Sequence, residues 1–217
     1  MIRHLMEWLF PRKCILCRSI LGKDETDLCG KCRTDQPEYH YGKKKVPFTE
    51  AMTAVWMYQG NVRRSLHRYK FRGARHYAGP YGRLVAMRVL RDLPPCDMVT
   101  WVPISGKRLR SRGYDQVELL AKAAAPELGI PPERLLEKIR DNRANSDLKT
   151  PAERRANVLG VYRAVEPERL RGKRVLLLDD IVTTGATASE CARVLLTAGA
   201  EEVYFAAVAA AGTTSSK

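Results

Sequence analysis

The chain has 217 residues, of which 45% are hydrophobic, so it is long enough for one α/β domain with a small appendage and too apolar to be a disordered protein. Lysine and arginine total 38 against 24 aspartate and glutamate, and the net charge of +14 favours polyanions and phosphorylated metabolites as partners. No apolar run approaches the roughly 20 residues that a membrane-spanning helix needs, so no bilayer span is expected and a cytoplasmic location is predicted.

The chain begins with a short amphipathic segment. Leu5, Trp8 and Leu9 recur at helical spacing, and the segment lacks the longer apolar run and the small-residue cleavage site of a secretory signal. A short helix on the surface of the following domain is therefore predicted over residues 1–10, in preference to a membrane anchor.

Two matched cysteine pairs follow. Two residues separate Cys14 from Cys17, and two separate Cys29 from Cys32, so each pair can present two thiolates from one tight turn. Disulfides are the alternative, but a reducing cytoplasm disfavours them. Four thiolates suit a tetrahedral Zn²⁺ with no open position, which holds a fold together and performs no chemistry. Residues 1–49 are therefore predicted to form a small zinc ribbon.

Residues 50–212 are predicted to form one α/β domain, because short apolar strands alternate with helices in a way that is typical of a mainly parallel sheet covered by helices. The expected strands are Ala51–Tyr58, Met98–Pro103, Arg174–Asp179 and Glu202–Val208, and the expected helices are Val62–Phe71, Tyr77–Leu90, Gln116–Ala125 and Ala186–Thr197. The polar stretch Leu136–Arg163 is predicted to be a long functional loop with a helical start at Ala152–Asn157. The last residues, 213–217, are predicted to be a disordered tail.

Residues 51–91 contain no acidic residue and form the most basic part of the chain. Their cations are Arg63, Arg64, Arg68, Lys70, Arg72, Arg75, Arg83, Arg88 and Arg91. Tyr69, Phe71 and Tyr77 are interleaved with them, and aromatic rings beside a basic groove suit the stacking of unpaired bases. Single-stranded DNA is therefore a predicted partner, with Arg68, Lys70 and Arg72 as candidate contacts. In the alternative interpretation the rings pack inward and the arginines form a solvated face or a lid over a pyrophosphate group.

The strongest local signal lies in Val175–Thr187. Its apolar start suits a buried parallel strand, and Asp179 and Asp180 follow, which predicts that both carboxylates lie at the strand's carboxyl end, where open α/β sheets bind ligands. In Thr183–Thr187, Gly185 lets backbone amides turn inward at the start of a helix, and the hydroxyls add donors. This combination predicts a phosphate site whose acidic pair accepts hydrogen bonds from ribose hydroxyls or holds Mg²⁺ through water.

Two other kinds of protein have an apolar strand that ends in paired aspartates. A nucleoside triphosphatase would also need a G-x-x-x-x-G-K-[ST] loop, and the nearest match, Gly106–Lys107, lacks the earlier glycine and the following hydroxyl. A receiver domain carries its aspartates near its beginning, whereas only residues 181–217 follow Asp180. Neither alternative fits the sequence.

Val175–Thr187 resembles the phosphoribosyl pyrophosphate (PRPP) signature of type I phosphoribosyltransferases, with four apolar residues, two acidic ones and then T-x-G-x-T. Further segments extend the resemblance over nearly the whole chain, to the ComF family. These segments are Cys14, Cys17, Cys29 and Cys32, then Tyr69–Gly73, Val102–Gln116 and Glu153–Asn157.

The resemblance implies a type I phosphoribosyltransferase-like domain behind a zinc ribbon, and a role in natural competence, DNA uptake and the handling of single-stranded DNA. PRPP with Mg²⁺ is the implied ligand, and proteins of the competence machinery are implied partners. Carried over residue by residue, the family pattern places ribose hydroxyls at Asp179 and Asp180, the 5′-phosphate at Thr183, Thr184, Gly185, Ala186 and Thr187, and pyrophosphate at a loop of Ser105, Gly106 and Lys107. No general acid or base is assigned.

Three classes of function remain open at this stage. A competence protein that uses PRPP is preferred over a salvage or biosynthetic phosphoribosyltransferase, because transfer chemistry needs neither a zinc ribbon nor an acid-free basic segment. A nonenzymatic PRPP sensor is equally compatible with the motifs, since residues that bind a ligand do not prove turnover. Pyrophosphate release with a defined acceptor would distinguish a transferase from the other two.

Overall fold

The computed structural model describes residues 11–40, 42, 44–142 and 150–212. The helix predicted over residues 1–10 and the disordered tail predicted for residues 213–217 lie outside these ranges. Within them, none of the helices combines the length and the apolar character needed to cross a bilayer.

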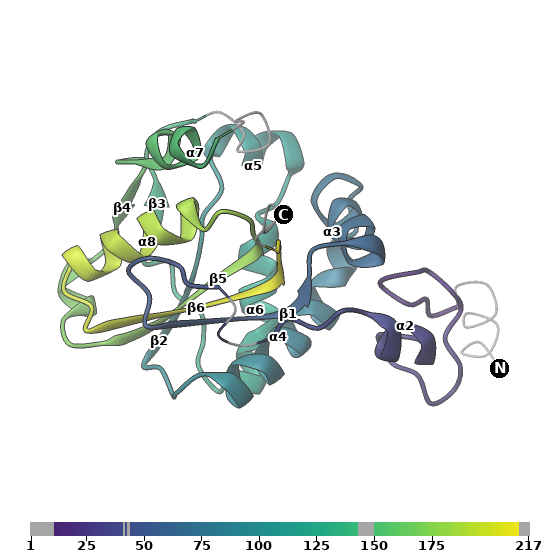
Figure 1. The fold of residues 1–217 in the computed structure, drawn as a ribbon. Coiled ribbons are helices and arrows are strands. Elements are labelled where there is room, and N and C mark those ends of the chain that lie inside the picture. The colour runs from purple at the N-terminus through teal and green to yellow at the C-terminus, as the bar shows by residue number, and fades with distance from the viewer. Residues whose placement is uncertain (1–10, 41, 43, 143–149, 213–217) are drawn as a thin grey trace, which may run out of the picture.

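Four parallel strands form the central sheet in the order β1-β6-β5-β2 (Figure 1). The strands are β1 (Ala51–Met57), β2 (Met98–Trp101), β5 (Arg174–Val182) and β6 (Glu202–Ala210). Their near-continuous apolar sequences follow from burial on both faces of the sheet. The predicted mainly parallel sheet is confirmed, and β5 runs three residues beyond its predicted end, because Ile181 and Val182 still pair with β6.

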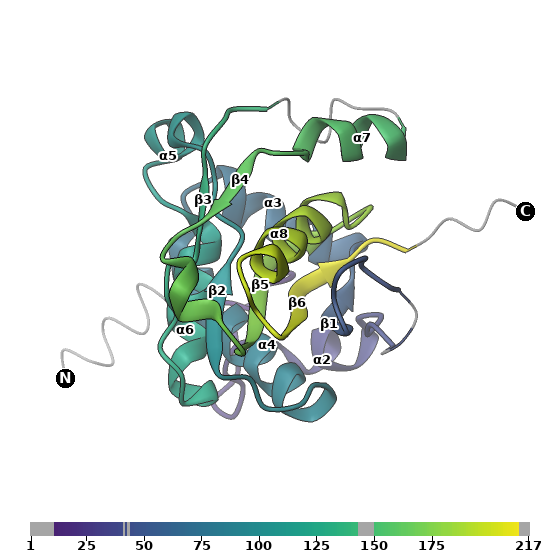
Figure 2. The same ribbon diagram turned by 90° about the vertical axis from the view of Figure 1, so that its left-hand side faces the viewer.

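Helices cover both faces of this sheet (Figure 2). On one face lie α3 (Gly60–Phe71), α4 (Ala78–Asp92) and α6 (Gln116–Leu128), and on the other lies α8 (Ala186–Thr197). The α4 and α6 backbones approach closely at Gly82, where a Cβ atom would lie 2.6 Å from the backbone of Ala123. Three shorter helices connect the larger elements: η1 (Arg75–Tyr77), α5 (Gly106–Arg112) and η3 (Pro167–Leu170).

The polar stretch after α6 is not the single long loop that was predicted. It begins and ends in a two-stranded antiparallel sheet, β3 (Leu136–Lys138) with β4 (Tyr162–Ala164). Between them lies α7 (Pro151–Val158), which begins with a capping box of Thr150 and Glu153. The strands are too short for hydrophobic period to reveal, and they form because their backbones pair across a separation of more than twenty residues.

Residues 11–40, called here the N-terminal ribbon, pack against α3 and α4 at one end of the molecule (Figure 1). They include the short helix α2 (Gly30–Asp35). Ile15 and Leu16 are buried in the same apolar cluster as Tyr69 and Tyr81, and the Ser65 hydroxyl donates a hydrogen bond to the Ile15 carbonyl. The ribbon therefore extends the core on the α3 side of the sheet.

Candidate functional site

Asp179 and Asp180 project to opposite faces of the sheet. Side chains alternate along a strand, and β5 remains paired with β6 through Val182, so the alternation continues past both residues. Asp180 is 2% exposed on the α3 and α6 face, and Asp179 lies on the α8 face. Both carboxylates lie near the carboxyl end of β5, and Asp180 is nevertheless buried, because the fold supplies this carboxylate with partners.

Those partners come from α3 and the start of α6. The Lys70 ammonium lies 2.8 Å from Asp180 Oδ1, and Gln116 Nε2 donates a hydrogen bond of 3.0 Å to Asp180 Oδ2. Arg112 in turn donates to Gln116 Oε1. A buried carboxylate is tolerated when a cation and a hydrogen-bond donor offset its lost hydration, so Asp180 ties α3 to the sheet.

Asp179 has a different environment. Its Oδ1 accepts a hydrogen bond of 2.7 Å from the Asp180 amide, while burial and the adjacent Asp180 charge raise the pKa of Asp179 well above its usual value. Burial raises the pKa of Tyr162 on β4 and of Cys191 on α8, and the Asp179 charge raises both further. Cys191 is fully buried and packs in the core on the α8 side of the sheet.

The turn after β5 has the backbone conformation that an anion site requires. Gly185 adopts φ 83°, a left-handed conformation that favours glycine, and it caps the N-terminus of α8. Thr184 Oγ1 accepts a hydrogen bond of 3.4 Å from the Ala186 amide, and the Gly185 carbonyl accepts one of 2.8 Å from Ser189. The first amides of α8 thus face the turn at the positive end of the helix dipole.

The segment that leads from the ribbon to β1 supports this turn from below. Val46 is buried, and its Cγ2 would lie 3.3 Å from a Cβ atom placed on Gly185. The Lys44 ammonium donates to the Thr183 carbonyl and, at 3.4 Å, to the Ala211 carbonyl. Burial lowers the pKa of Lys44. A cation is therefore held directly behind the turn.

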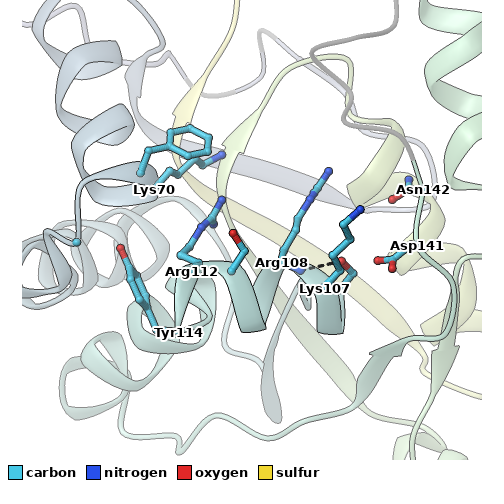
Figure 3. Close-up of a pocket in the computed structure, with 11 residues that line it drawn as sticks. Lys70, Lys107, Arg108, Arg112, Tyr114, Asp141 and Asn142 are labelled. Atoms are coloured by element: carbon cyan, nitrogen blue, oxygen red, sulfur yellow. Dashed lines mark hydrogen bonds between the residues drawn. The ribbon is translucent and has the colours of Figure 1, made fainter.

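A pocket of about 540 Å³, called here the α5 pocket, opens at the loop after β2 (Figure 3). Because β2 and β5 are adjacent and parallel, this loop and the turn after β5 lie at the same edge of the sheet. The pocket's side chains include Lys70, Lys107, Arg108, Arg112, Ser105, Phe71, Asp141 and Asn142. In Figure 3, Lys107 lies beside Asp141 and Asn142, and Lys70 and Arg112 lie toward the other end.

Ser105, Gly106 and Lys107 were expected to form a loop, but Gly106 and Lys107 belong to the first turn of α5. Ser105 caps that helix by accepting a hydrogen bond of 3.3 Å from the Arg108 amide, and it is 4% exposed. Lys107 is exposed and projects into the pocket. The structure therefore places Lys107 and Lys70 in the same pocket, toward opposite ends, and the helix adds Arg108 and Arg112.

Lys138 on β3 lies close to the same region. Its ammonium donates a hydrogen bond of 2.6 Å to Asn142 Oδ1 and lies 5.5 Å from the centre of the Tyr162 ring. Burial, and secondarily the charge of Arg108, lower the pKa of Lys138 to about 8. The short antiparallel sheet thus places a poorly solvated amine beside the α5 pocket.

The four ribbon cysteines lie together. Cys14 and Cys32 are buried, the Sγ atoms of the four lie within 4.8 Å of one another, and the Sγ atoms of Cys17 and Cys29 are 3.6 Å apart. Thiolates around tetrahedral Zn²⁺ are about 3.8 Å apart, given a zinc to sulfur distance of about 2.3 Å. The separation is too long for a disulfide, and the free thiols fit a closed zinc site.

The three candidate DNA contacts point to different places. Arg68 donates to the carbonyls of Ile15 and Leu16 at 3.0 and 2.7 Å, Lys70 pairs with Asp180, and Arg72 is exposed. The aromatic residues of the basic segment also separate. Tyr69 and Tyr77 are buried, whereas Phe71 is 63% exposed and lies 5.2 Å from the Arg112 guanidinium.

Some arginines of the basic segment are buried or paired, so fewer of its charges are exposed to solvent than the sequence suggests. Arg88 is 7% exposed and donates to the Ala54 and Tyr39 carbonyls, and Arg83 pairs with Asp27 at 2.6 Å. The inward-packing alternative is therefore correct for Tyr69 and Tyr77, but Arg88 is buried and does not belong to the solvated face or lid that this alternative expected. Lys44, Gln116 and Lys138 were not singled out from the sequence, because their roles arise from contacts between distant segments.

Comparisons with known proteins agree with these features. Residues 118–217 match the family model described as a phosphoribosyl transferase domain, and residues 5–41 match the double zinc ribbon domain. DNA utilization protein YhgH of Salmonella typhi is 26% identical over 89% of this chain and 94% of its own length. Competence protein F of Haemophilus influenzae is 26% identical over 89% and 95%. Competence protein ComFC of Streptococcus pneumoniae is 29% identical over 88% and 96%.

Among solved structures, glutamine PRPP amidotransferase from B. subtilis, complexed with ADP and GMP, is 27% identical over 62% of this chain, with a TM-score of 0.42. This chain spans 26% of that enzyme. The curated relatives, by contrast, are matched over nearly their full length, and both family models fall where the cysteine ribbon and the α/β fold were found. These matches support a ComF-family protein, with a phosphoribosyltransferase domain behind a double zinc ribbon.

Proposed function

We propose that this protein binds PRPP together with Mg²⁺ at the carboxyl edge of β5 and β2, and that it acts in DNA uptake during natural competence. One observation carries the proposal: the Gly185 turn at the N-terminus of α8 follows the acidic pair directly and shares an edge of the sheet with a cationic pocket. Ligands of open α/β sheets bind at this edge, so the turn, the acidic pair and the pocket can hold the phosphate, the ribose and the pyrophosphate of one PRPP molecule side by side.

The 5′-phosphate is assigned to the turn Thr183–Thr187. Backbone amides of the first turn of α8 and the hydroxyls of Thr183, Thr184 and Thr187 supply donors, and the helix dipole favours the anion. Gly185 and Ala186 keep the backbone accessible because neither has a long side chain. Lys44, behind the Thr183 carbonyl, adds positive charge without entering the site.

The ribose and Mg²⁺ are assigned to the acidic pair, with separate roles. Asp179 is the less buried of the two carboxylates and lies on the α8 face, and a divalent cation carried by the ligand would favour its ionised form against burial. Mg²⁺ is commonly held by one or two carboxylates plus substrate phosphates, so this sparse set of ligands fits a metal that arrives with PRPP. Asp180 contacts ribose only when it exchanges its bond to Lys70.

Pyrophosphate is assigned to the α5 pocket. Lys107, Arg108 and Arg112 present cations from one helix, with Ser105 and Gly106 at its start. Guanidinium groups bind phosphate oxygens through two donors at once, which suits a doubly phosphorylated ligand. Lys70 lies between this pocket and Asp180 and can contact either one.

Single-stranded DNA is the proposed macromolecular partner. Relatives over the whole chain are named for competence and for DNA utilization, and the acid-free segment presents Arg72 and Phe71 at the surface. In this proposal Lys70 shapes the surface through its internal contact with Asp180, and Arg68 and Arg72 contact the strand. The ribbon's four cysteines hold a structural Zn²⁺, whose filled coordination shell leaves no position for chemistry.

The test is calorimetric titration of zinc-replete protein with PRPP and Mg²⁺, comparing wild type with Gly185→Ala and Gly199→Ala. Both glycines have positive φ and flank α8, so both substitutions strain the same helix, but only Gly185 lies at the proposed phosphate turn. We expect Gly185→Ala to lower the affinity for PRPP at least tenfold, which corresponds to about 1.4 kcal/mol, and Gly199→Ala to leave this affinity unchanged. Equal affinities in both variants, or no binding by folded wild type, would reject the site.

A second measurement separates the classes of function. Pyrophosphate release is followed with PRPP and Mg²⁺, with and without single-stranded DNA, and with candidate bases and amines. Release that requires a particular base or amine identifies a transferase of salvage or biosynthesis. Binding without release, under every condition, identifies a PRPP-responsive regulator.

A further inference from the structure

A second pocket, of about 590 Å³, lies between the N-terminal ribbon and the end of α3, and is called here the ribbon groove. One wall comes from Pro11, Arg12, Lys13 and Arg18 of the ribbon, and the other from residues 68–77, which include Arg68, Arg72, His76 and Tyr77. Neither wall alone encloses a groove, so the site exists only because the ribbon packs against α3.

The charge of this groove is not neutralised by the described part of the chain. The described residues of its lining include four arginines and one lysine and no carboxylate. Arg12 and Arg68 donate to backbone carbonyls, which fix the guanidinium groups in place and leave their net charge uncompensated. Among the described residues, Lys13, Arg18 and Arg72 form no ion pair. Such a concentration of like charge is unfavourable unless an anion occupies it.

Arg18 gives an independent indication that the groove has a function. It adopts φ 71°, in the left-handed region that glycine prefers, and its amide donates a hydrogen bond of 2.9 Å to the Cys14 carbonyl in the first cysteine turn. Glycine would take this conformation without strain. The chain instead places an exposed arginine there, with its side chain in the groove. Strained residues of this kind are concentrated at functional sites.

The form of the groove favours a polymer of phosphates over a single phosphate. Its cations come from two separate segments and line an open trough, so they can contact successive groups of one chain. Gly73 lines both the ribbon groove and the α5 pocket, and the exposed ring of Phe71 lies in the latter. A strand that leaves the groove at Gly73 therefore meets an aromatic face on which a base can stack. An acidic peptide has no bases to stack on that ring.

We infer that the ribbon groove binds the phosphate backbone of single-stranded DNA, with Arg12, Lys13 and Arg18 on one side of the strand and Arg68 and Arg72 on the other. The inference rests on the proposed role in handling DNA and adds a location to it. It also gives the ribbon a direct part in binding, because three of the five cations belong to the ribbon.

The test measures binding of a labelled single-stranded oligothymidylate by fluorescence anisotropy over a series of salt concentrations. The groove variant is Arg18→Gly/Arg72→Gln, and the matched control is Arg171→Gln/Lys173→Gln, which removes two exposed charges near the amino end of β5, the opposite edge of the sheet. Arg18→Gly should not impair folding, because glycine suits the left-handed conformation. PRPP titration of each variant, as above, reports on the separate site.

We expect the groove variant to bind the strand at least tenfold more weakly and to lower the slope of log affinity against log salt by about 1.4, since each lost phosphate contact on a single strand contributes about 0.7. The control should retain affinity and slope, and both proteins should bind PRPP like wild type. If the groove variant and the control lose affinity for the strand equally, or if the groove variant binds like wild type, the groove is not the DNA site. Either result would leave the proposal that the protein binds DNA intact.

Two further outcomes bear on the nature of the partner. Wild type that binds no strand at all contradicts the proposed DNA role itself, and the groove assignment falls with it. Competition by polyglutamate as strong as that by unlabelled strand, at equal charge, would assign the groove to an acidic protein segment and reject the inference. Competition by the strand alone supports it.

Discussion

The two basic pockets differ in how their cations are held. In the α5 pocket, Lys70 pairs with Asp180, Arg112 donates to Gln116, and Asp141 lies among the lysines and arginines. In the ribbon groove, Arg12 donates to backbone carbonyls, Arg68 donates to backbone carbonyls and to the Tyr77 hydroxyl, and the described lining contains no acid. Carboxylates offset part of the positive charge of the α5 pocket, whereas the described lining of the ribbon groove contains none.

This difference teaches that a count of cations does not identify a polyanion site. Lys70 and Arg88 belong to the most basic segment of the chain, yet both are committed to internal carboxylates or carbonyls. A carbonyl acceptor orients a guanidinium without cancelling its charge, and a carboxylate does both. The partner of each cation is therefore more informative than the cation itself.

Removal of zinc should have the largest effect, and it should affect the ribbon groove but not the α5 pocket. Structural zinc contributes on the order of 10 kcal/mol to the folding of small zinc domains, so chelation should unfold the ribbon and eliminate the groove, while the α5 pocket retains its ligand. Hydrogen exchange measured by mass spectrometry should show lost protection in residues 11–40 and retained protection in β5 and α8. Cys17→Ser should reproduce the effect, and Cys96→Ser, outside the cluster, should not. Joint loss of protection would contradict this separation.

Lys70→Met should destabilise the protein by about 3 kcal/mol, because it leaves the buried Asp180 carboxylate without its cation. Urea denaturation measures the change in the free energy of unfolding. The double variant Lys70→Met/Asp180→Asn should recover part of the loss, since it removes the uncompensated charge. Arg72→Gln, a neighbouring cation with no internal carboxylate, should cost under about 0.5 kcal/mol. Similar costs for the two single variants would show that the contrast between the pockets is unfounded.

Arg18→Gly should be more stable than Arg18→Ala by about 1 kcal/mol, because alanine retains the penalty of a positive φ and glycine removes it. Both substitutions delete the same guanidinium, so any difference between them reports backbone strain alone. Thermal unfolding of the zinc-replete variants measures it. If the two variants have the same melting temperature, Arg18 is not strained. One of the two observations that support the ribbon groove as a binding site would then be lost.

Lys138→Met should have the smallest effect, and the effect should depend on pH. Burial and Arg108 lower the pKa of Lys138 from its usual 10.5 to about 8, so the folded state disfavours the ammonium. This penalty is complete below about pH 8 and vanishes as pH rises past 10.5, where the unfolded amine also loses its proton. The stability of the variant relative to wild type should therefore be more favourable near pH 7 than near pH 10. A difference that does not change with pH would show that Lys138 is ordinarily solvated.

Local sequence signals were sufficient for the strands of the central sheet, for helix α8 and for the Gly185 turn before it. The strands of the central sheet and helix α8 lie where they were expected, because apolar runs and the Gly185 turn are local signals. The stretch Leu136–Arg163 was misread, since three-residue strands carry no period of their own. Tyr69 and Tyr77 were read as stacking surfaces, but an aromatic residue looks the same in sequence whether it packs inward or outward.

By itself, the sequence determined the α/β class, the zinc ribbon and the position of the Val175–Thr187 signature, because each depends on residues that are neighbours along the chain. Only the tertiary structure decided that Asp179 and Asp180 face opposite sides of the sheet, that Lys70 compensates Asp180, and that the ribbon and α3 enclose a groove. Those features depend on which segments pack together. Packing decides which partner each charged side chain has, and therefore whether its charge is compensated inside the protein or remains able to bind a ligand.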